Sequence, residues 1–434
     1  MTQETLLLGQ VLTFQADPFT APIAEAAHVE RTGGVLLRDG RIVATGPADS
    51  LRPTAPMAPV HDYGDALILP GFVDAHAHYP QTGIIASWGK RLIDWLNGYT
   101  FPAEMAFGDA AHANDIAGRY LDLVLDHGTT SICSYCTIHP SSVEAYFTAA
   151  ATRGMAVAGG LTAMDRNAPD GLRDTAQTAY DNSAALIAAW HGKGRATYAI
   201  TPRFTPTSTP EQLEALGALW QANPECLMQT HLSEQEDEVA WVQTLEPWAR
   251  DYLDTYERYG LLGPGALFGH AIWLTARERA RLAETGSALV HCPTSNTFIG
   301  SGLFDMAARR ADGIAVGLAT DTGGGSSFSM LRTMAAAYEI GQLRGTALHP
   351  GQLLWLATTG SAQVMRMADR IGTLAPGSDA DLTVLNLAST PAIAQRAARA
   401  DAFWEAVFPT IMMGDDRAVE AVWVGGKPLR GAAA

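Results

Sequence analysis

The chain has 434 residues, of which 47% are hydrophobic and 17% are charged, and its formal net charge is −16. The apolar content can fill a large core, and the negative charge excludes nucleic acid as an expected partner, because phosphate binding needs a basic surface. No apolar run approaches the ~20 residues of a membrane span, and the first residues lack the basic and apolar segments of a signal peptide. We expect a cytoplasmic protein that does not contact a membrane.

The first sixty-odd residues have the pattern of β-structure. Two short apolar runs flank Asp39-Gly40, which is a strong signal for a β-hairpin. The same character returns near the other end, in residues 381–387 and 418–424. We therefore predict one small β-sandwich domain that is built from both termini, residues 1–66 plus 373–434.

Between these segments, candidate strands and helices alternate, which is typical of a parallel sheet. The eight candidate strands cover residues 67–74, 129–134, 155–161, 197–202, 227–231, 266–270, 288–292 and 316–320. Two of the helical stretches begin with a capping-box pattern, Ser141 with Glu144 and Thr275 with Glu278. Eight such units predict an α/β fold in which a (β/α)₈ TIM-type barrel, residues 67–372, is inserted in the β-domain.

The four cysteines are Cys133, Cys136, Cys226 and Cys292, too few for a disulfide framework in so long a chain. Cys133 and Cys136 form a single C-x-x-C pair, whereas a zinc ribbon would need a second pair. We expect these two thiols to pack in or just after a strand.

The first barrel strand leads into a His-x-His pair. Residues two apart on a strand point to the same face, about 6–7 Å apart, so His76 and His78 can reach one ion at the strand's end. Imidazole suits zinc, iron, copper or nickel. A lone His-x-His is more often two ordinary histidines near a turn, so the pair needs support from the rest of the chain.

That support comes from the ends of the later strands, where the active sites of such barrels lie. The residues that end or follow strands four to eight are Arg203, His231 with Glu234, His270, His291 and Asp321. Histidines and a carboxylate that converge on one barrel mouth match a catalytic metal site with an open position for water.

This pattern resembles the amidohydrolase superfamily, whose fold is a (β/α)₈ barrel with a small β-domain from both termini. Residues 372–385 are similar to the superfamily's return into that domain. Many members bind two metals through a carbamylated lysine after the fourth strand. The only lysines here are Lys90, Lys193 and Lys427, none of which follows that strand, so the resemblance narrows to the one-metal deaminase branch.

In that branch, the resemblance implies one Zn²⁺ per chain, with Fe²⁺ as the alternative. The implied metal ligands are His76, His78, His231 and Asp321. The implied catalytic residues are Glu234 as proton shuttle, and Asp321 and His270 beside the attacking water. With this set complete, we expect His291 to have a structural role near the site.

Residues 94–107, 201–212, 230–238 and 414–422 resemble the guanine-deaminating members of the branch. This resemblance implies a purine site formed by Gln81, Arg203, Phe204 and His270, release of xanthine and ammonia, and a homodimer. The chemistry of Arg203 agrees, because its N–H groups only donate. They suit the 6-carbonyl of guanine, and the 6-amino group of adenine would leave them unpaired.

Simpler roles stay open for three of these residues. Arg203 could pair with a barrel carboxylate, Phe204 could belong to the core, and Asp321 could be a turn residue. Two rival functions also stay open. One is a deaminase or dechlorinating hydrolase that acts on a pterin, a triazine or an adenosine derivative. The other is a non-catalytic barrel protein for binding or assembly, although such proteins typically lose metal ligands and none is missing here.

Overall fold

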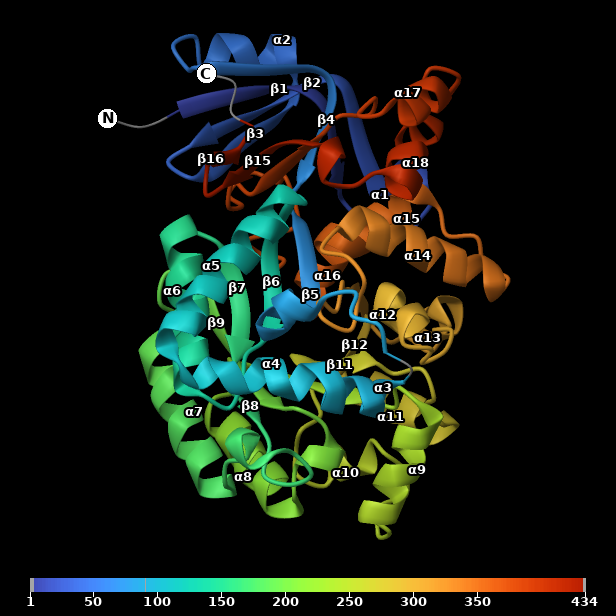
Figure 1. The fold of residues 1–434 in the computed structure, drawn as a ribbon. Coiled ribbons are helices and arrows are strands. Elements are labelled where there is room, and N and C mark those ends of the chain that lie inside the picture. Colours follow the sequence, from blue (N-terminus) through green and yellow to red (C-terminus); the bar gives the residue numbers. More distant parts are fainter. Residues whose placement is uncertain (1–3, 90, 432–434) are drawn as a thin grey trace.

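The computed structural model describes residues 4–89 and 91–431, which form a barrel below a second, smaller sheet (Figure 1). The barrel sheet is parallel and has the strand order β13-β12-β11-β10-β9-β7-β6-β5, with the short β8 (Thr162–Ala163) paired to β9. Its strands are β5 (Phe72–His78), β6 (Thr129–Tyr135), β7 (Ala156–Gly160), β9 (Ala196–Pro202), β10 (Leu227–Leu232), β11 (Ala266–His270), β12 (Ala288–His291) and β13 (Val316–Leu318). The predicted (β/α)₈ barrel is confirmed.

Helices surround this sheet (Figure 1). Those that follow barrel strands are α5 (Ala110–Asp126), α6 (Pro140–Arg153), α7 (Ala176–Trp190), α8 (Pro210–Ala222), α9 (Glu236–Leu245), α10 (Asp254–Glu257), α11 (Ala276–Thr285), α12 (Pro293–Phe298), α13 (Met306–Ala311) and α14 (Met330–Leu343). Two short helices, α3 (Leu92–Trp95) and α4 (Phe101–Met105), lie in the long connection between β5 and α5. The remaining α-helices are α1 (Ile23–Ala26), α2 (Ala48–Leu51), α15 (Pro350–Trp355), α16 (Ser361–Val364), α17 (Pro391–Ala397) and α18 (Phe403–Met413).

Hydrogen bonds join the first barrel strand to the loop after the last one. The backbone N–H of Asp321 donates to the carbonyl of His76 at 2.9 Å, and that of His78 donates to the carbonyl of Thr322 at 3.1 Å. The buried carboxylate of Asp74 accepts from the backbone N–H of Thr320 at 3.1 Å and also from its hydroxyl. These bonds place Asp321 beside His76 and His78.

The smaller sheet has seven strands in the order β16-β15-β14-β4-β1-β2-β3. It draws on both ends of the chain: β1 (Glu4–Phe14), β2 (Ala27–Arg38), β3 (Arg41–Pro47) and β4 (Val60–Pro70), then β14 (Leu382–Leu385), β15 (Val419–Val424) and β16 (Lys427–Arg430). The hairpin predicted at Asp39-Gly40 joins β2 to β3, and both turn residues have positive φ, 48° and 82°.

The boundaries predicted for the first barrel strand are wrong. Residues 67–70 belong to β4, which pairs with β1 and β14 in the smaller sheet, and β5 begins at Phe72. Gly71 separates the two strands, and a Cβ at this position would lie 2.1 Å from Thr130 Oγ1. Both strands are apolar and buried here, so hydrophobicity alone does not reveal the change of sheet. The division into residues 1–66 plus 373–434 and 67–372 stays a prediction.

The two capping boxes have different outcomes. Thr275 and Glu278 form the predicted reciprocal bonds at the start of α11. The box predicted for Ser141 with Glu144 is wrong, because α6 begins with Pro140, and the Ser141 hydroxyl donates to the carbonyl of Phe107 instead, at 2.9 Å. Proline has a φ suited to the first helical position, which moves the helix start ahead of the serine.

The four cysteines are buried free thiols. Cys133 lies in β6 and Cys136 follows that strand directly, as predicted. Across residues 4–89 and 91–431, no helix is long and apolar enough to cross a bilayer.

Candidate active site

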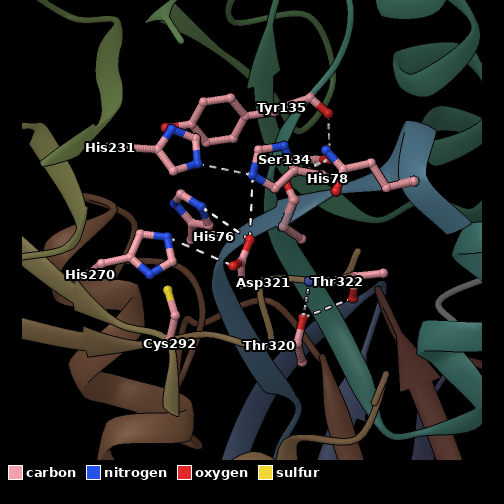
Figure 2. Close-up of polar contacts among 12 residues, drawn as sticks. His76, His78, Ser134, Tyr135, His231, His270, Cys292, Thr320, Asp321 and Thr322 are labelled. Carbon is pink, nitrogen blue, oxygen red and sulfur yellow. Dashed lines mark hydrogen bonds and ion pairs between the residues drawn. The ribbon is translucent and has the colours of Figure 1, made fainter. Parts of the chain in front are cut away.

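Three imidazoles converge at the C-terminal end of the barrel strands (Figure 2). The candidate ligand atoms of His76, His78 and His231 all lie within 4.8 Å of one another. The Nε2 atoms of His78 and His231 are 3.2 Å apart. Asp321 Oδ1 lies 3.4 Å from Nε2 of both His76 and His78. The structure thus brings together the four residues predicted as metal ligands.

The donor atoms fit a metal ion. His76 Nε2 is buried and has no hydrogen-bond partner among the residues described. His231 Nδ1 lies 2.7 Å from the backbone oxygen of Arg203. A carbonyl only accepts, so Nδ1 carries the proton and Nε2 keeps its lone pair for a metal. Burial, assisted by neighbouring imidazoles, holds the pKa of His78 and His231 well below the ordinary value, and neutral imidazole is the form that binds metals.

The carboxylate of Asp321 stays ionised although it is buried. Burial raises the pKa of Asp321, but the contact of its carboxylate with His76 Nε2, at 3.4 Å, and the electrostatic influence of His76 and His270 outweigh that effect and bring the pKa to about 2. The backbone of Asp321 has a φ of 49°, a left-handed conformation that is uncommon outside glycine. At neutral pH this position therefore supplies a negative charge beside the three imidazoles.

His270 lies between two carboxylates. Its Nε2 is 3.6 Å from Glu234 Oε2 and 3.7 Å from Asp321 Oδ2. Burial lowers the pKa of His270, but Glu234 and Asp321 raise it more, so the net pKa lies above its ordinary value. Its other nitrogen, Nδ1, contacts Asn296 Oδ1 at 2.8 Å, which fixes the ring so that Nε2 faces the carboxylates. Like Asp321, His270 has a left-handed backbone, with a φ of 65°.

Glu234 is poised to exchange a proton near neutral pH. Burial raises the pKa of its carboxyl to about 7, and only 2% of the residue is exposed. The Ser301 hydroxyl donates to Oε1 at 2.9 Å. The backbone N–H of Glu234 donates to Glu238 at 2.8 Å. One hydrogen bond therefore holds the carboxylate of Glu234, and another holds the main chain that carries it.

Cys292 is a neighbour of the site that no sequence pattern indicates. Its sulfur lies within 4.8 Å of candidate ligand atoms of His76, His270 and Asp321 (Figure 2). Burial raises the pKa of this thiol well above the ordinary value. Since a thiolate is the form that binds metals, the protonated thiol leaves the nitrogen and carboxylate set as the better ligands.

The predicted substrate residues line the same pocket. Its lining includes Gln81, Arg203 and Phe204 together with His78, His231, Glu234, His270 and Asp321, and α3 contributes Leu92 and Trp95. Phe204 also packs in an apolar cluster with Leu92 and Ile299, so it belongs both to the pocket wall and to the core. The ring of His291 stacks on Phe304, with centroids 4.5 Å apart, and His291 is not part of the pocket lining.

Arg203 pairs with a carboxylate, which is the simpler role considered for it above. Its Nη1 donates to Glu104 Oε2 at 2.7 Å, and Gln81 Nε2 donates to Glu104 Oε1 at 2.9 Å. Glu104 is 0% exposed and Arg203 is 3% exposed. Arg203 therefore has both roles, since it forms a buried ion pair and also lines the pocket.

Several residues that support the site escape prediction from the sequence. Tyr135 stacks on His78 with ring centroids 4.4 Å apart, and Asn296 and Ser301 position His270 and Glu234. Glu104 lies within residues 94–107, and the resemblance of this segment to the guanine-deaminating members was the one sequence signal that could have pointed to Glu104. The acidic stretch after Glu234 also contains Glu238, a buried residue rather than part of a solvated surface.

A barrel of this topology with candidate ligand side chains at its mouth is the arrangement that metal-dependent hydrolases use. The model of the Amidohydrolase family matches residues 67–429, and that of the bacterial imidazolonepropionase-like composite domain matches residues 33–56. The chain belongs to the amidohydrolase family.

Guanine deaminases are among its relatives. That of Escherichia coli (strain K12) is 39% identical over 406 residues, 93% of this chain and 92% of that protein. A solved structure of E. coli guanine deaminase has a TM-score of 0.96 and 38% identity, and the match covers 99% of this chain and 100% of that one. Guanine deaminase from C. acetobutylicum, solved with guanine bound in its active site, has a TM-score of 0.89 and 26% identity, with coverage of 98% and 100%.

Proposed function

We propose that this chain is an enzyme that hydrolyses guanine to xanthine and ammonia. One observation carries the proposal: Gln81, Arg203 and Phe204 line the same pocket as Glu234, His270 and the candidate metal ligands. The reacting groups and the groups suited to a purine edge therefore face one space. The guanine deaminases among its relatives support the same substrate.

Hydrogen bonding accounts for the choice of guanine. The Arg203 guanidinium offers only donors, and these can bond the 6-carbonyl of the substrate. The 6-amino group of adenine would leave a buried guanidinium facing another donor, a mismatch of the kind that can cost ~10⁴–10⁵ in rate. Phe204 presents an apolar ring on which the purine can stack, and Gln81 can bond a ring edge.

Residues of the chain can carry the protons that the reaction moves. Glu234, with a pKa of about 7, can give a proton to N3 of guanine, which makes C2 electrophilic. Ionised Asp321 can accept the proton of the attacking water, and His270, between the two carboxylates, can hold the new oxygen. The proton held by Asp321 can then pass to the amino nitrogen, so that ammonia leaves C2, and the hydroxyl proton at C2 returns to Glu234, which leaves xanthine.

The proposed cofactor is one Zn²⁺, held by His76, His78, His231 and Asp321, with Fe²⁺ as the alternative. Bound there, such an ion would lower the pKa of its water to about 7 and make hydroxide available at neutral pH. The orphaned Nε2 of His76 and the tautomer of His231 support this assignment.

The test is release of xanthine and ammonia from guanine by metal-replete protein, with adenine, cytosine, a pterin, a triazine and adenosine alongside. We expect rapid xanthine formation that a chelator abolishes. Preference for a substrate without a 6-carbonyl would favour the rival deaminase or dechlorinating function instead. Protein that holds no stoichiometric metal and turns over nothing would favour a binding or assembly role.

Four further expectations belong to this proposal: purine catabolism, the cytoplasm as the location, a homodimer, and the division into two domains. Four free cysteines without a disulfide support a reducing compartment. Light scattering on a sizing column would test the dimer, and limited proteolysis followed by mass spectrometry would test the domain boundaries.

A further inference from the structure

Glu104 connects the two polar residues of the purine pocket. It lies in α4, on the connection between β5 and α5, and its side chain is fully buried. One carboxylate oxygen accepts from Gln81 Nε2 at 2.9 Å, and the other accepts from Arg203 Nη1 at 2.7 Å. Glu104 itself is not part of the pocket lining, so it acts on a substrate only through these two residues.

The first effect of Glu104 is on the Gln81 amide. A carboxylate only accepts hydrogen bonds, so the end of the amide that faces Glu104 must be the NH₂ group. The carbonyl oxygen then lies on the other side, above Gly323, where a Cβ would come within 2.0 Å of Oε1. Glu104 and Gly323 together hold the amide in one orientation, so a ligand meets a defined donor and acceptor.

The second effect is on charge. In residues 4–89 and 91–431, Glu104 is the only carboxylate that pairs with Arg203. The other contacts of the guanidinium are the Met164 sulfur at 4.0 Å and the ring of Phe101 at 5.6 Å. Glu104 uses one of the five N–H donors of the guanidinium and cancels its charge. The ion pair thus has no net charge, and the remaining N–H donors of Arg203 are free to bond a ligand.

An unpaired guanidinium in the same place would select differently. A buried cation attracts an anionic ligand strongly because the surroundings screen it little. Glu234, His270 and Asp321 line the same pocket, but none of them pairs with Arg203 among the residues described, so the balance of charge at Arg203 depends on Glu104.

We propose that Glu104 is a positioning residue that determines specificity: it orients the Gln81 amide and neutralises Arg203, so that the pocket prefers uncharged oxopurines to anionic ones. This inference rests on the proposed function, because it assumes that Gln81 and Arg203 contact a purine.

The test compares two ligands of the metal-loaded protein by calorimetry at pH 7: hypoxanthine, which is uncharged, and urate, which is anionic. We expect E104Q to strengthen urate binding relative to hypoxanthine at least tenfold, and to raise KM for guanine about tenfold with a smaller change in kcat. The matched control is E104D, which keeps the charge and shortens the side chain. It should also raise KM, but it should give urate no advantage. An unchanged ratio of the two dissociation constants in E104Q would overturn the proposal.

A double variant keeps the proposal testable should E104Q not fold. E104Q/R203Q removes both charges, so its ratio of urate to hypoxanthine affinity should stay within threefold of wild type. A tenfold loss for urate in this variant would mean that the Arg203 charge acts uncancelled, and it would refute the inference. These binding ratios need no turnover. A wild-type protein that releases no xanthine from guanine would therefore refute the proposed function while leaving the charge test in place.

Discussion

The substitution Glu234→Gln tests the proton shuttle most directly. The amide keeps the shape of the carboxylate and can still accept the Ser301 hydrogen bond, which is 2.9 Å in the native protein. It cannot carry a proton to the ring, whereas the native carboxyl has a pKa of about 7. A positioned acid or base contributes roughly 10²–10⁴ in rate, or about 3–5 kcal/mol of barrier. We expect kcat to fall by that factor and KM to change little.

The assay follows xanthine formation by absorbance, and metal content is measured on the same samples. Glu234 belongs to neither cluster of candidate ligand side chains, so the variant should retain its metal. Glu236→Gln is the matched control, because it is the same substitution at an exposed position two residues further on, and it should have wild-type rates. A kcat for Glu234→Gln within tenfold of wild type, with full metal content, would refute the shuttle role.

Three further predictions concern recognition, metal binding and stability. Arg203→Lys should lower kcat/KM for guanine at least tenfold in steady-state kinetics, because an ammonium cannot replace the guanidinium fork. An unchanged selectivity for guanine over adenine would show that Arg203 does not contact the purine. His231→Ala should weaken metal affinity about 100-fold or more, since even the residues that hydrogen-bond to metal ligands contribute 10–100-fold. Atomic emission measures the bound metal, and His291→Gln, outside both ligand clusters, should keep its metal in the same measurement. Burial raises the pKa of Asp174 from 3.8 to about 7, so the folded protein binds more protons than the unfolded chain between these values, and stability should fall as pH rises from about 4 to 7 and level off above. The full pKa shift corresponds to ~4 kcal/mol of stability, which partial exposure reduces to ~1–2 kcal/mol. The free energy of unfolding of Asp174→Asn, measured in urea, should lack that part of the pH dependence. A pH profile equal to wild type would contradict the raised pKa of Asp174.

The parts of the site that lie at strand ends were predictable from the sequence. His231, His270 and Asp321 lie far apart in the chain, but each follows an apolar segment of strand length. In a parallel barrel all strands end at the same mouth, so topology alone brings them together. No pairwise contact has to be inferred for this step, which is why the candidate ligand set could be assembled without the structure.

The contacts of Glu104 could not be predicted in this way. Its partners Gln81 and Arg203 are 23 and 99 residues away, and α4 lies in a connection rather than in a regular βα unit. Its position depends on how that connection packs over the barrel, and no local pattern encodes this. The end of β4 at Pro70 was also hidden, since two apolar buried strands follow each other and differ only in the sheet with which they pair.

The left-handed backbone at His270 and Asp321 has a consequence for evolution in the laboratory. Each such residue costs of order 1–3 kcal/mol, and glycine would adopt the same φ without strain. A library selected only for heat resistance should therefore enrich glycine at these two positions and discard the side chains that the chemistry needs. Selection at the barrel mouth has to score turnover and thermal tolerance together, whereas distant surface positions can be optimised for heat alone.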